Sequence, residues 1–217
     1  MNILAIDSTG NKTSVASKIG DDLLSLSIHH NRKDRPDWQS LLEKISISSD
    51  DLQNFDLFTF GQGPGSYTSI RSVATFLKAI ALVHQKPLMP LSNLECIAYG
   101  HSLFHKNDSI IHSAISSDID SEIYYCPYEL KNSLLVPLKN EAILARNDLD
   151  SIFTRKQGDT FVGNGWANLS DIKQKTSDAS TIIELAMARY SEKEEYNPDD
   201  ANPVYLKDTS YKKLNDQ

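Results

Sequence analysis

A glycine-rich turn joins an apolar run to a long helical pattern, and this junction constrains the fold more than any other part of the chain. The turn lies within FGQGPGSYTSIRS, residues 60–72. The apolar run before it, residues 55–61, is typical of a buried strand, and residues 66–85 keep helical spacing for about five turns. A strand, a tight turn and a long helix in this order are typical of an α/β protein.

The residues before this junction predict a three-stranded meander and a helix. Residues 3–7 form a near-continuous apolar run, and residues 12–18 and 23–28 alternate apolar with polar side chains, with turn residues between the runs. A helix is expected over Trp38–Ile45. Strand patterns begin again after residue 105, so we expect two α/β lobes, residues 1–105 and residues 106–217.

The glycine turn does not match the motifs of phosphate-binding loops. Counted from Gly61, a P-loop needs glycine and lysine where Ser66 and Tyr67 stand. A dinucleotide fingerprint needs its third glycine at the same Ser66. The turn is therefore interpreted as positioning the helix that follows, with Ser66 as its N-cap. The residues of this helix-positioning turn are Gly61, Gly63, Pro64, Gly65 and Ser66.

The helix after the turn has two apolar faces rather than one. The expected core face consists of Ile70, Val73, Ala74, Leu77 and Ala81. A second face carries small and apolar side chains, which are Ser69, Ser72, Phe76, Ala79 and Val83. A helix with this much apolar surface is expected to be covered on two sides, by the second lobe or by another chain.

Charge and composition restrict the class of partner and the compartment. The net charge is −7, whereas proteins that hold nucleic acid themselves usually carry a basic face. The basic segments at residues 29–35 and 210–216 are short and contain acidic residues. No apolar run is long enough to span a bilayer, the N-terminus has no signal-peptide pattern, and Cys96 and Cys126 have no CxxC spacing. We therefore expect a cytoplasmic chain with reduced thiols.

The order of motifs along the chain resembles the TsaB (YeaZ) family. The motifs are ILAIDST at residues 3–9, FTFGQGPGSYTSIR at 58–71, LVHQKPLMPLSNLECIAYG at 82–100, DSEIYYCPYE at 120–129, VGNGW at 162–166, NPVYLKD at 202–208 and YKKL at 211–214. Together they cover nearly the whole chain. The resemblance implies an actin-like/Hsp70-like ATPase (ASKHA) fold, with two lobes that each contain a mixed sheet and flanking helices.

The resemblance also implies a function and partners. Proteins of this family take part in forming N6-threonylcarbamoyladenosine in tRNA, as non-catalytic partners of the transferase TsaD, with the ATPase TsaE in the larger complex. The first two helices dock TsaD, and pair two copies into a homodimer when TsaD is absent. The tRNA is expected to be contacted only indirectly, and no cofactor is expected.

Carried over to this chain, the expected interface lies on the two helices at residues 38–45 and 66–85. Three departures from the family pattern fall on it. The usual histidine–serine pair is missing before the paired leucines Leu41 and Leu42, Glu43 replaces a proline, and Ser72 replaces a glycine. The expected interface residues are Trp38, Leu41, Leu42, Ile45, Ser69, Ser72, Phe76, Ala79 and Val83.

An ATPase or phosphotransferase that acts on its own is the alternative function. Asp7, Ser8 and Thr9 follow the first strand and resemble the phosphate-binding element of actin-like kinases. Such enzymes need a second phosphate loop that converges on the first, and no glycine-rich run other than VGNGW at 162–166 follows Asp118 and Asp120. These residues are therefore interpreted as a vestigial nucleotide site.

Metal and peptidase chemistry are weakly supported by the sequence. His101 and His105 have the i, i+4 spacing of two ligands on one helix face, but the glutamate of an HExxH motif does not follow His101. No metal site is therefore predicted. A serine–histidine–acid set is not recognisable from spacing, although such sets assemble in space rather than in sequence order.

Overall fold

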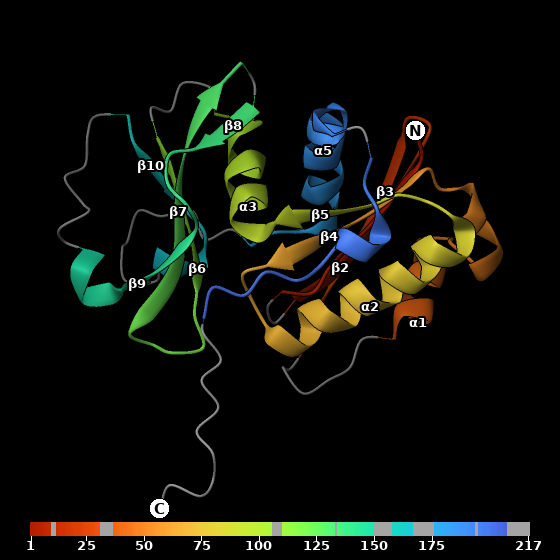
Figure 1. The fold of residues 1–217 in the computed structure, drawn as a ribbon, viewed down its shortest axis with the longest axis horizontal. Helices are drawn as coiled ribbons and strands as arrows, with labels where there is room; N and C mark the ends of the chain where they lie inside the picture. Colours follow the sequence, from red (N-terminus) through yellow and green to blue (C-terminus); the bar gives the residue numbers. More distant parts are fainter. Residues whose placement is uncertain are drawn as a thin grey trace, which may run out of the picture.

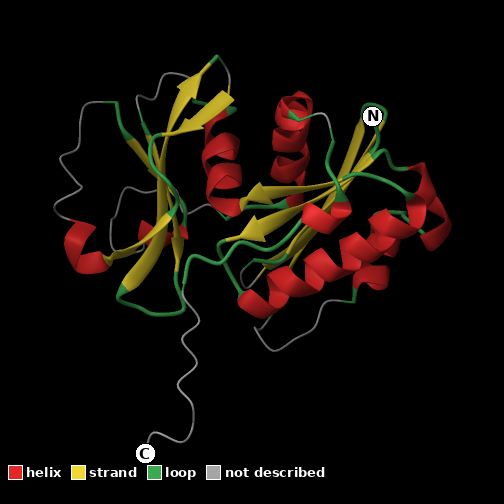
Figure 2. Ribbon diagram, viewed as in Figure 1, coloured by secondary structure: helices red, strands yellow, loops and turns green. Residues whose placement is uncertain are grey.

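Two five-stranded sheets and the helices around them form the fold in the computed structural model (Figures 1 and 2). The structure describes residues 1–9, 12–30, 37–105, 110–132, 134–149, 158–166, 176–193 and 195–207. Most of the basic segment at 29–35, and all of that at 210–216, lie outside these residues.

The first sheet contains the predicted meander followed by two parallel strands. Its order is β3-β2-β1-β4-β5. Strand β2 pairs antiparallel with both β1 and β3, whereas β4 runs parallel to β1 and β5 runs parallel to β4. The sheet is therefore mixed, as expected. Its strands are β1 (Ile3–Asp7), β2 (Lys12–Ile19), β3 (Asp22–His29), β4 (Leu57–Gly63) and β5 (Leu88–Ser92).

The second sheet is built from shorter strands around one long hairpin. Strand β6 pairs antiparallel with β7 and parallel with β10, and β7 also pairs with β8 and β9. The strands are β6 (Ile111–Ser116), β7 (Glu122–Lys131), β8 (Leu134–Pro137), β9 (Ala142–Ala145) and β10 (Thr160–Val162). Strand patterns beginning again after residue 105 predicted this second sheet.

The helices separate the two sheets and cover the outside of the first. Figure 1 shows α3 (Asn93–Ser102) and α5 (Ala179–Arg189) between the sheets, with α1 (Trp38–Lys44) and α2 (Tyr67–His84) on the far side of the first sheet. Short 3₁₀ helices complete the described elements: η1 (Ser49–Asn54), η2 (Arg146–Asp148), η3 (Asn164–Trp166), η4 (Tyr190–Glu192) and η5 (Pro198–Asp200).

The two largest hydrophobic clusters follow from this layering, and a third, smaller one surrounds Trp166 at the second sheet. One lies between the first sheet and the helices α1 and α2, and includes Leu4, Phe58 and Leu77. The other includes Ile3 of the first sheet, Ile183 of α5 and Cys126 of the second sheet. Because this second core contains residues of both sheets, the two expected lobes share one packed interior.

The C-terminal part of the chain returns to the first sheet. Helix α5 packs on β1, β2 and β4 as well as on α3. Further along, the Leu88 amide donates to the Tyr196 carbonyl at 3.1 Å, and the Val204 amide donates to the Gln62 carbonyl at 2.9 Å. Residues 106–217 are therefore not confined to the second sheet, and the boundary near residue 105 stays a prediction.

The ends of the first two helices follow local sequence rules only in part. Asp37 caps α1 by accepting a hydrogen bond from the Ser40 amide at 3.3 Å. Ser66 occupies the N-cap of α2, as expected, but makes no side-chain capping bond and donates instead to Ser69 Oγ at 3.1 Å. The helix ends at Gln85, which adopts the left-handed conformation with φ of 51°.

None of the helices described here has both the length and the apolar character needed to cross a bilayer.

Candidate functional site

Asp7, at the end of β1, is buried and both of its carboxylate oxygens accept hydrogen bonds from protein side chains. Its side chain is 2% exposed. Asn93 Nδ2 donates to Oδ1 at 2.9 Å, and Ser177 Oγ donates to Oδ2 at 2.5 Å. Asn93 is the first residue of α3, and Ser177 lies just before α5. Three elements far apart in the sequence therefore meet at one carboxylate, and we call these three residues the Asp7 site.

Asn93 connects the Asp7 site to the glycine turn. Its Oδ1 accepts a hydrogen bond from the Gly63 amide at 2.8 Å. Its Nδ2 also lies 2.7 Å from Ser177 Oγ and 3.2 Å from Thr9 Oγ1. A single buried carboxamide thus joins β1, the turn before α2 and the segment before α5, which is how buried polar groups are normally satisfied.

Burial dominates the protonation of Asp7. Desolvation raises the pKa of its carboxyl group above the ordinary aspartate value, and hydrogen bonds from Ser177, Thr9 and Asn93 oppose that rise. Both carboxylate oxygens of Asp7 accept hydrogen bonds, from Asn93 and Ser177, so side chains of the protein itself hold this carboxylate in place.

The glycine turn packs directly on the segment that contains Asp7. A Cβ atom at Gly61 would overlap Asn93 Nδ2 and lie 2.7 Å from Asp7 Oδ1. A Cβ atom at Gly65 would lie 2.6 Å from the Thr9 carbonyl, to which the Ser66 amide donates at 2.9 Å. The helix-positioning turn and the segment of Asp7 and Thr9, which were predicted separately, are therefore packed together.

Gly63 supports the turn from its other side. Its φ of +117° is a conformation that residues with a side chain rarely adopt, and a Cβ atom there would lie 2.7 Å from the Val204 carbonyl. The peptide between Gly63 and Pro64 is cis. The returning C-terminal segment is thus in close contact with the start of α2.

Ser8 and His30 are connected, but not as a nucleophile and its base. Ser8 Oγ and His30 Nε2 each lie 2.7 Å from Thr13 Oγ1, so the threonine stands between them. Ser8 is only 1% exposed. A hydrolytic serine needs direct contact with its base and access to substrate, so this chain of hydroxyls does not form a catalytic triad.

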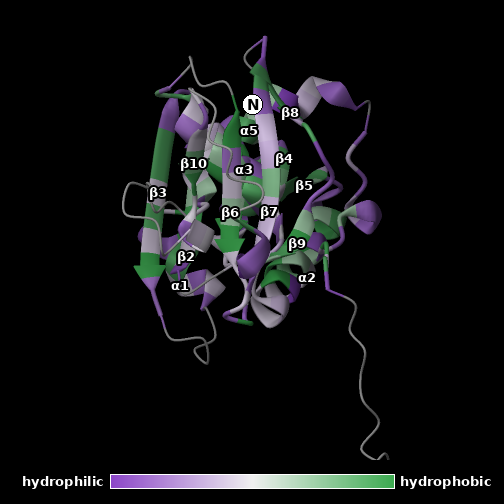
Figure 3. Ribbon diagram, turned by 90° about the vertical axis from the view of Figure 1, so that its left-hand side faces the viewer, coloured by the Kyte–Doolittle hydropathy of each residue, from purple (hydrophilic) through white to green (hydrophobic). Residues whose placement is uncertain are grey.

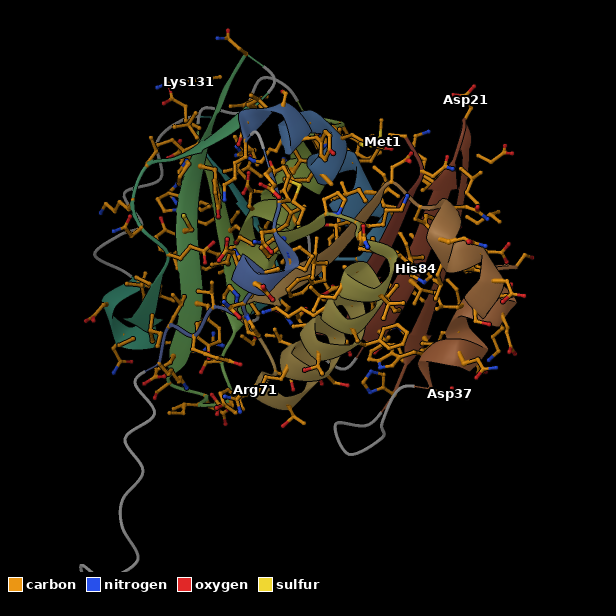
Figure 4. The ribbon with its side chains drawn as sticks, turned by 45° about the vertical axis from the view of Figure 1, so that its right-hand side comes forward. Met1, Asp21, Asp37, Arg71, His84 and Lys131 are labelled. Atoms are coloured by element: carbon orange, nitrogen blue, oxygen red, sulfur yellow. The ribbon has the colours of Figure 1, made fainter. Side chains whose placement is uncertain are left out.

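A stripe of exposed residues runs along the side of α2 that faces away from the sheet. Figure 4 shows this helix along the surface between Arg71 near its start and His84 at its end. The residues recur at helical spacing, and Val83 is 76% and Leu82 52% exposed. We call these residues the outer stripe of α2: Ser72, Thr75, Ala79, Leu82 and Val83.

The expected interface residues of α2 divide between this stripe and its edge. Ser72, Ala79 and Val83 belong to the stripe. Ser69 and Phe76 are half-buried, and the Phe76 ring stacks on Trp38 of α1 with centroids 5.7 Å apart. The second apolar face predicted for this helix is therefore open at its outer side and packed on α1 at its edge.

The expected interface residues of α1 are mostly inside the monomer. Leu41, Leu42 and Ile45 are 3–4% exposed and belong to the core beneath α1 and α2. In this conformation they hold α1 on the sheet, and a docking partner cannot reach them. Trp38 alone among the four is half-buried rather than buried.

The two histidines of α3 and its following turn lie next to each other. The rings of His101 and His105 stack with centroids 4.4 Å apart. Among the residues that the structure describes, no three His, Cys, Asp or Glu side chains form a group that could hold a metal ion.

Comparisons with known proteins place the chain in a family. The family model for "TsaD: tRNA N6-adenosine threonylcarbamoyltransferase" matches residues 25–196. Two similar proteins are both named tRNA threonylcarbamoyladenosine biosynthesis protein TsaB. That of Haemophilus influenzae is 24% identical, with 99% of this chain and 97% of that protein covered. That of Escherichia coli K12 is 25% identical, with 99% and 98% covered.

A solved structure shares the whole fold. YeaZ from Pseudomonas aeruginosa has a TM-score of 0.77 and 23% identity, and the match covers 94% of this chain and 99% of that one. The predicted α/β fold with two mixed sheets and flanking helices is therefore confirmed. The family model spans most of the chain and the full-length relatives are TsaB proteins, so the chain belongs to this threonylcarbamoyltransferase-related family, as a member of its TsaB (YeaZ) group.

Proposed function

We propose that this protein is a non-catalytic subunit in the formation of N6-threonylcarbamoyladenosine in tRNA, and that it docks a TsaD-like transferase through the outer stripe of α2. The names of its full-length relatives support the pathway. We propose the docking role because this stripe is exposed, with Val83 76% exposed. The Asp7 carboxylate, in contrast, accepts hydrogen bonds from Asn93 and Ser177 of the same chain.

The chemistry of the stripe suits a helix from another protein. Ser72, Thr75 and Ala79 are short, so a second helix can approach closely at the middle of α2. Leu82 and Val83 supply apolar area at its C-terminal end, where burial contributes roughly 25 cal/mol per Å². Trp38 and Phe76 flank the stripe and provide the aromatic residue type that often dominates binding energy.

The subunit is proposed to act through its partner rather than through its own nucleotide chemistry. Binding to one conformation of the transferase shifts the population of that conformation. A TsaE-like ATPase would belong to the larger complex. The net charge of −7 favours tRNA contact by the partners rather than by this chain. When the transferase is absent, we expect two copies to associate through the same helices.

Affinity for the TsaD-like protein of the same organism tests the docking surface. Val83→Glu places a charge on the exposed stripe and should weaken binding at least about ten-fold. Met187→Glu is the matched control, because Met187 is also exposed, at 44%, but lies on α5. Equal affinity of Val83→Glu and the wild type, measured by calorimetry, would show that the stripe is not the docking surface.

Phe76→Glu is a second variant at the edge of the stripe. Because Phe76 stacks on Trp38, this change combines loss of contact with a partner and disturbance of the packing between α1 and α2. We expect weaker co-purification with the transferase while the protein stays folded by circular dichroism. Unchanged co-purification would count against this edge of the interface.

Reconstitution distinguishes a subunit from an enzyme. Mass spectrometry of tRNA nucleosides should detect the modification only when this chain, a TsaD-like protein and a TsaE-like protein are combined. Product formed by this chain alone would show its own transferase activity. Unchanged modification in cells depleted of the chain would remove it from the pathway.

A further inference from the structure

Among the described residues, β3 has the longest strand edge to which no other strand is paired. β3 has eight residues and pairs with β2 on one side, and no described strand pairs with its other side. The opposite edge strand, β5, has five residues and contains Pro90, which blunts an edge because proline lacks an amide hydrogen. In the second sheet the outer strands β8, β9 and β10 have four, four and three residues.

β3 also lacks the features that usually prevent one edge from pairing with another. Between Asp22 and His29 it contains no charged residue and no proline, and its pairing with β2 continues without a register shift. Leu23 and Leu24 are 40% and 49% exposed. Figure 3 shows β3 along one side of the molecule with hydrophobic residues on it. The edge therefore offers both free backbone groups and apolar side chains.

The two faces of β3 have different side chains, which restricts how it can pair. Leu26 and Ile28 pack partly against the core under α1 and α2, and Leu24 lies on the same face because side chains alternate. Ser25 and Ser27 lie on the opposite face. Leu23 also lies on this serine face. A shift of one residue would exchange the faces, so only registers that place like faces together keep Leu24, Leu26 and Ile28 on one side.

We propose that β3 is a self-association edge, at which two copies of this chain pair antiparallel about a two-fold axis perpendicular to the sheet. Centred on Leu26, this pairing places Leu26 opposite Leu26 and Leu24 opposite Ile28 of the second copy. Ser25 then lies opposite Ser27 on the other face. Apolar side chains meet apolar ones and hydroxyls meet hydroxyls, so the edge is complementary to itself.

The charges at the two ends of β3 favour this direction. Asp21 and Asp22 lie at the turn that begins the strand, and His29 ends it. Antiparallel pairing brings the acidic end of one copy beside the histidine of the other, where a carboxylate can accept a hydrogen bond from imidazole. Parallel pairing would bring carboxylates against carboxylates, which is unfavourable. A second copy of this chain is therefore the occupant that the edge fits.

Oligomeric state in a variant that blocks the outer stripe of α2 tests this proposal. Val83→Glu should weaken association through α2, so a dimer that is as tight in this background as in the wild type must use another surface. Sedimentation velocity at concentrations up to about 100 μM should still show a dimer. The double variant Val83→Glu, Leu24→Lys should dissociate at least about ten-fold more readily, because the introduced ammonium group would face the apolar Ile28 of the second copy.

The control and the contrary outcomes separate this inference from the proposed function. Met187→Lys in the same background should leave the dimer unchanged, since Met187 lies on α5. A Val83→Glu protein that is monomeric throughout, or a dimer that survives Leu24→Lys, would overturn the β3 pairing. Neither result bears on docking of the transferase to α2, which the affinity measurements test.

Cross-linking tests the register independently. Leu26→Cys should form an intermolecular disulfide on mild oxidation, because residues directly opposite in an antiparallel pair have Cα atoms about 4.5–5.5 Å apart. The native Cys96 and Cys126 are buried and do not compete. Ser27→Cys lies opposite Ser25 in this pairing and should cross-link poorly. A cross-link at residue 27 that exceeds that at residue 26 would overturn the register.

Discussion

The Asp7 site and the outer stripe of α2 lie on either side of one glycine turn, yet they are opposite in character. At the Asp7 site, polar groups from three distant segments bond one another and exclude solvent, leaving the carboxylate 2% exposed. On the outer stripe, Val83 is 76% exposed and apolar area is left open. The first region is closed by the protein itself, and the second is open.

A glycine-rich turn of the kind that often binds phosphate can instead fix the position of the helix that follows it. A side chain would not fit at Gly61 or Gly65, because Asp7, Asn93 and Thr9 occupy the space that its Cβ atom would need. The Gly63 amide donates to Asn93 Oδ1 and the Ser66 amide donates to the Thr9 carbonyl, so the turn holds the first residues of α2 in a fixed position. Asp7 therefore contributes to the placement of α2, which carries the exposed surface.

The largest effect on stability is expected from Gly61→Ala. The new Cβ atom would overlap Asn93 and crowd Asp7, so unfolding in urea should be easier by about 3 kcal/mol. Gly20→Ala is the matched control, because its φ of +59° is unfavourable for alanine but no atom lies within 4 Å. That control should cost about 1 kcal/mol. Equal costs would mean that the Asp7 site is not closely packed.

Asn93→Ala should have the next largest effect. It leaves the Gly63 amide and Asp7 Oδ1 without their partner in a buried place, which costs about 2 kcal/mol. Asn202→Ala, on the exposed C-terminal segment, should change the free energy of unfolding by less than about 0.5 kcal/mol. If both asparagines cost the same in urea denaturation, the bonding network at Asp7 does not stabilise the fold.

Asp7→Asn should change how stability depends on pH. Because burial raises the folded-state pKa of Asp7, folding favours the protonated carboxyl group. The wild type should therefore lose stability as the pH rises from about 4 through the folded-state pKa, and the variant should lose less. The difference between their melting temperatures across this range measures the effect. Parallel pH profiles would show that Asp7 titrates as it does in the unfolded chain.

The smallest effect on stability is expected from Val83→Ser on the open stripe. Little surface is buried there, so the free energy of unfolding should change by less than about 0.5 kcal/mol. Val73→Ser, on the buried side of the same helix, should cost about 2 kcal/mol. A large loss of stability at Val83 would indicate that the stripe is already covered within the monomer.

The fold could be predicted because its signals are local. A near-continuous apolar run predicted β1, and alternation of side chains predicted β2 and β3. Helical spacing predicted a helix over residues 66–85, where the structure has Tyr67–His84. The same spacing identified both faces of that helix. The periodicity of a sequence indicates which residues share a face, and it can be determined without the tertiary structure.

The candidate site could be predicted only in part, because its contacts are not local. Asn93 and Ser177 are 86 and 170 residues from Asp7, and no spacing pattern links such positions. The helical pattern of α1 likewise could not show whether Leu41, Leu42 and Ile45 face the sheet or a partner. Only the packing of α1 on the first sheet decided that they lie inside.

Because the C-terminal segment returns to the first sheet, cutting the chain near residue 105 would not give two self-contained fragments. Helix α5 covers the first sheet, and residues 196–204 bond the strands and turn beside α2. A fragment ending near residue 105 would expose the apolar face that α5 covers, and the complementary fragment would carry α5 without its sheet. The two pieces should therefore be insoluble when expressed apart and reassemble when expressed together, so this chain suits fragment complementation better than truncation.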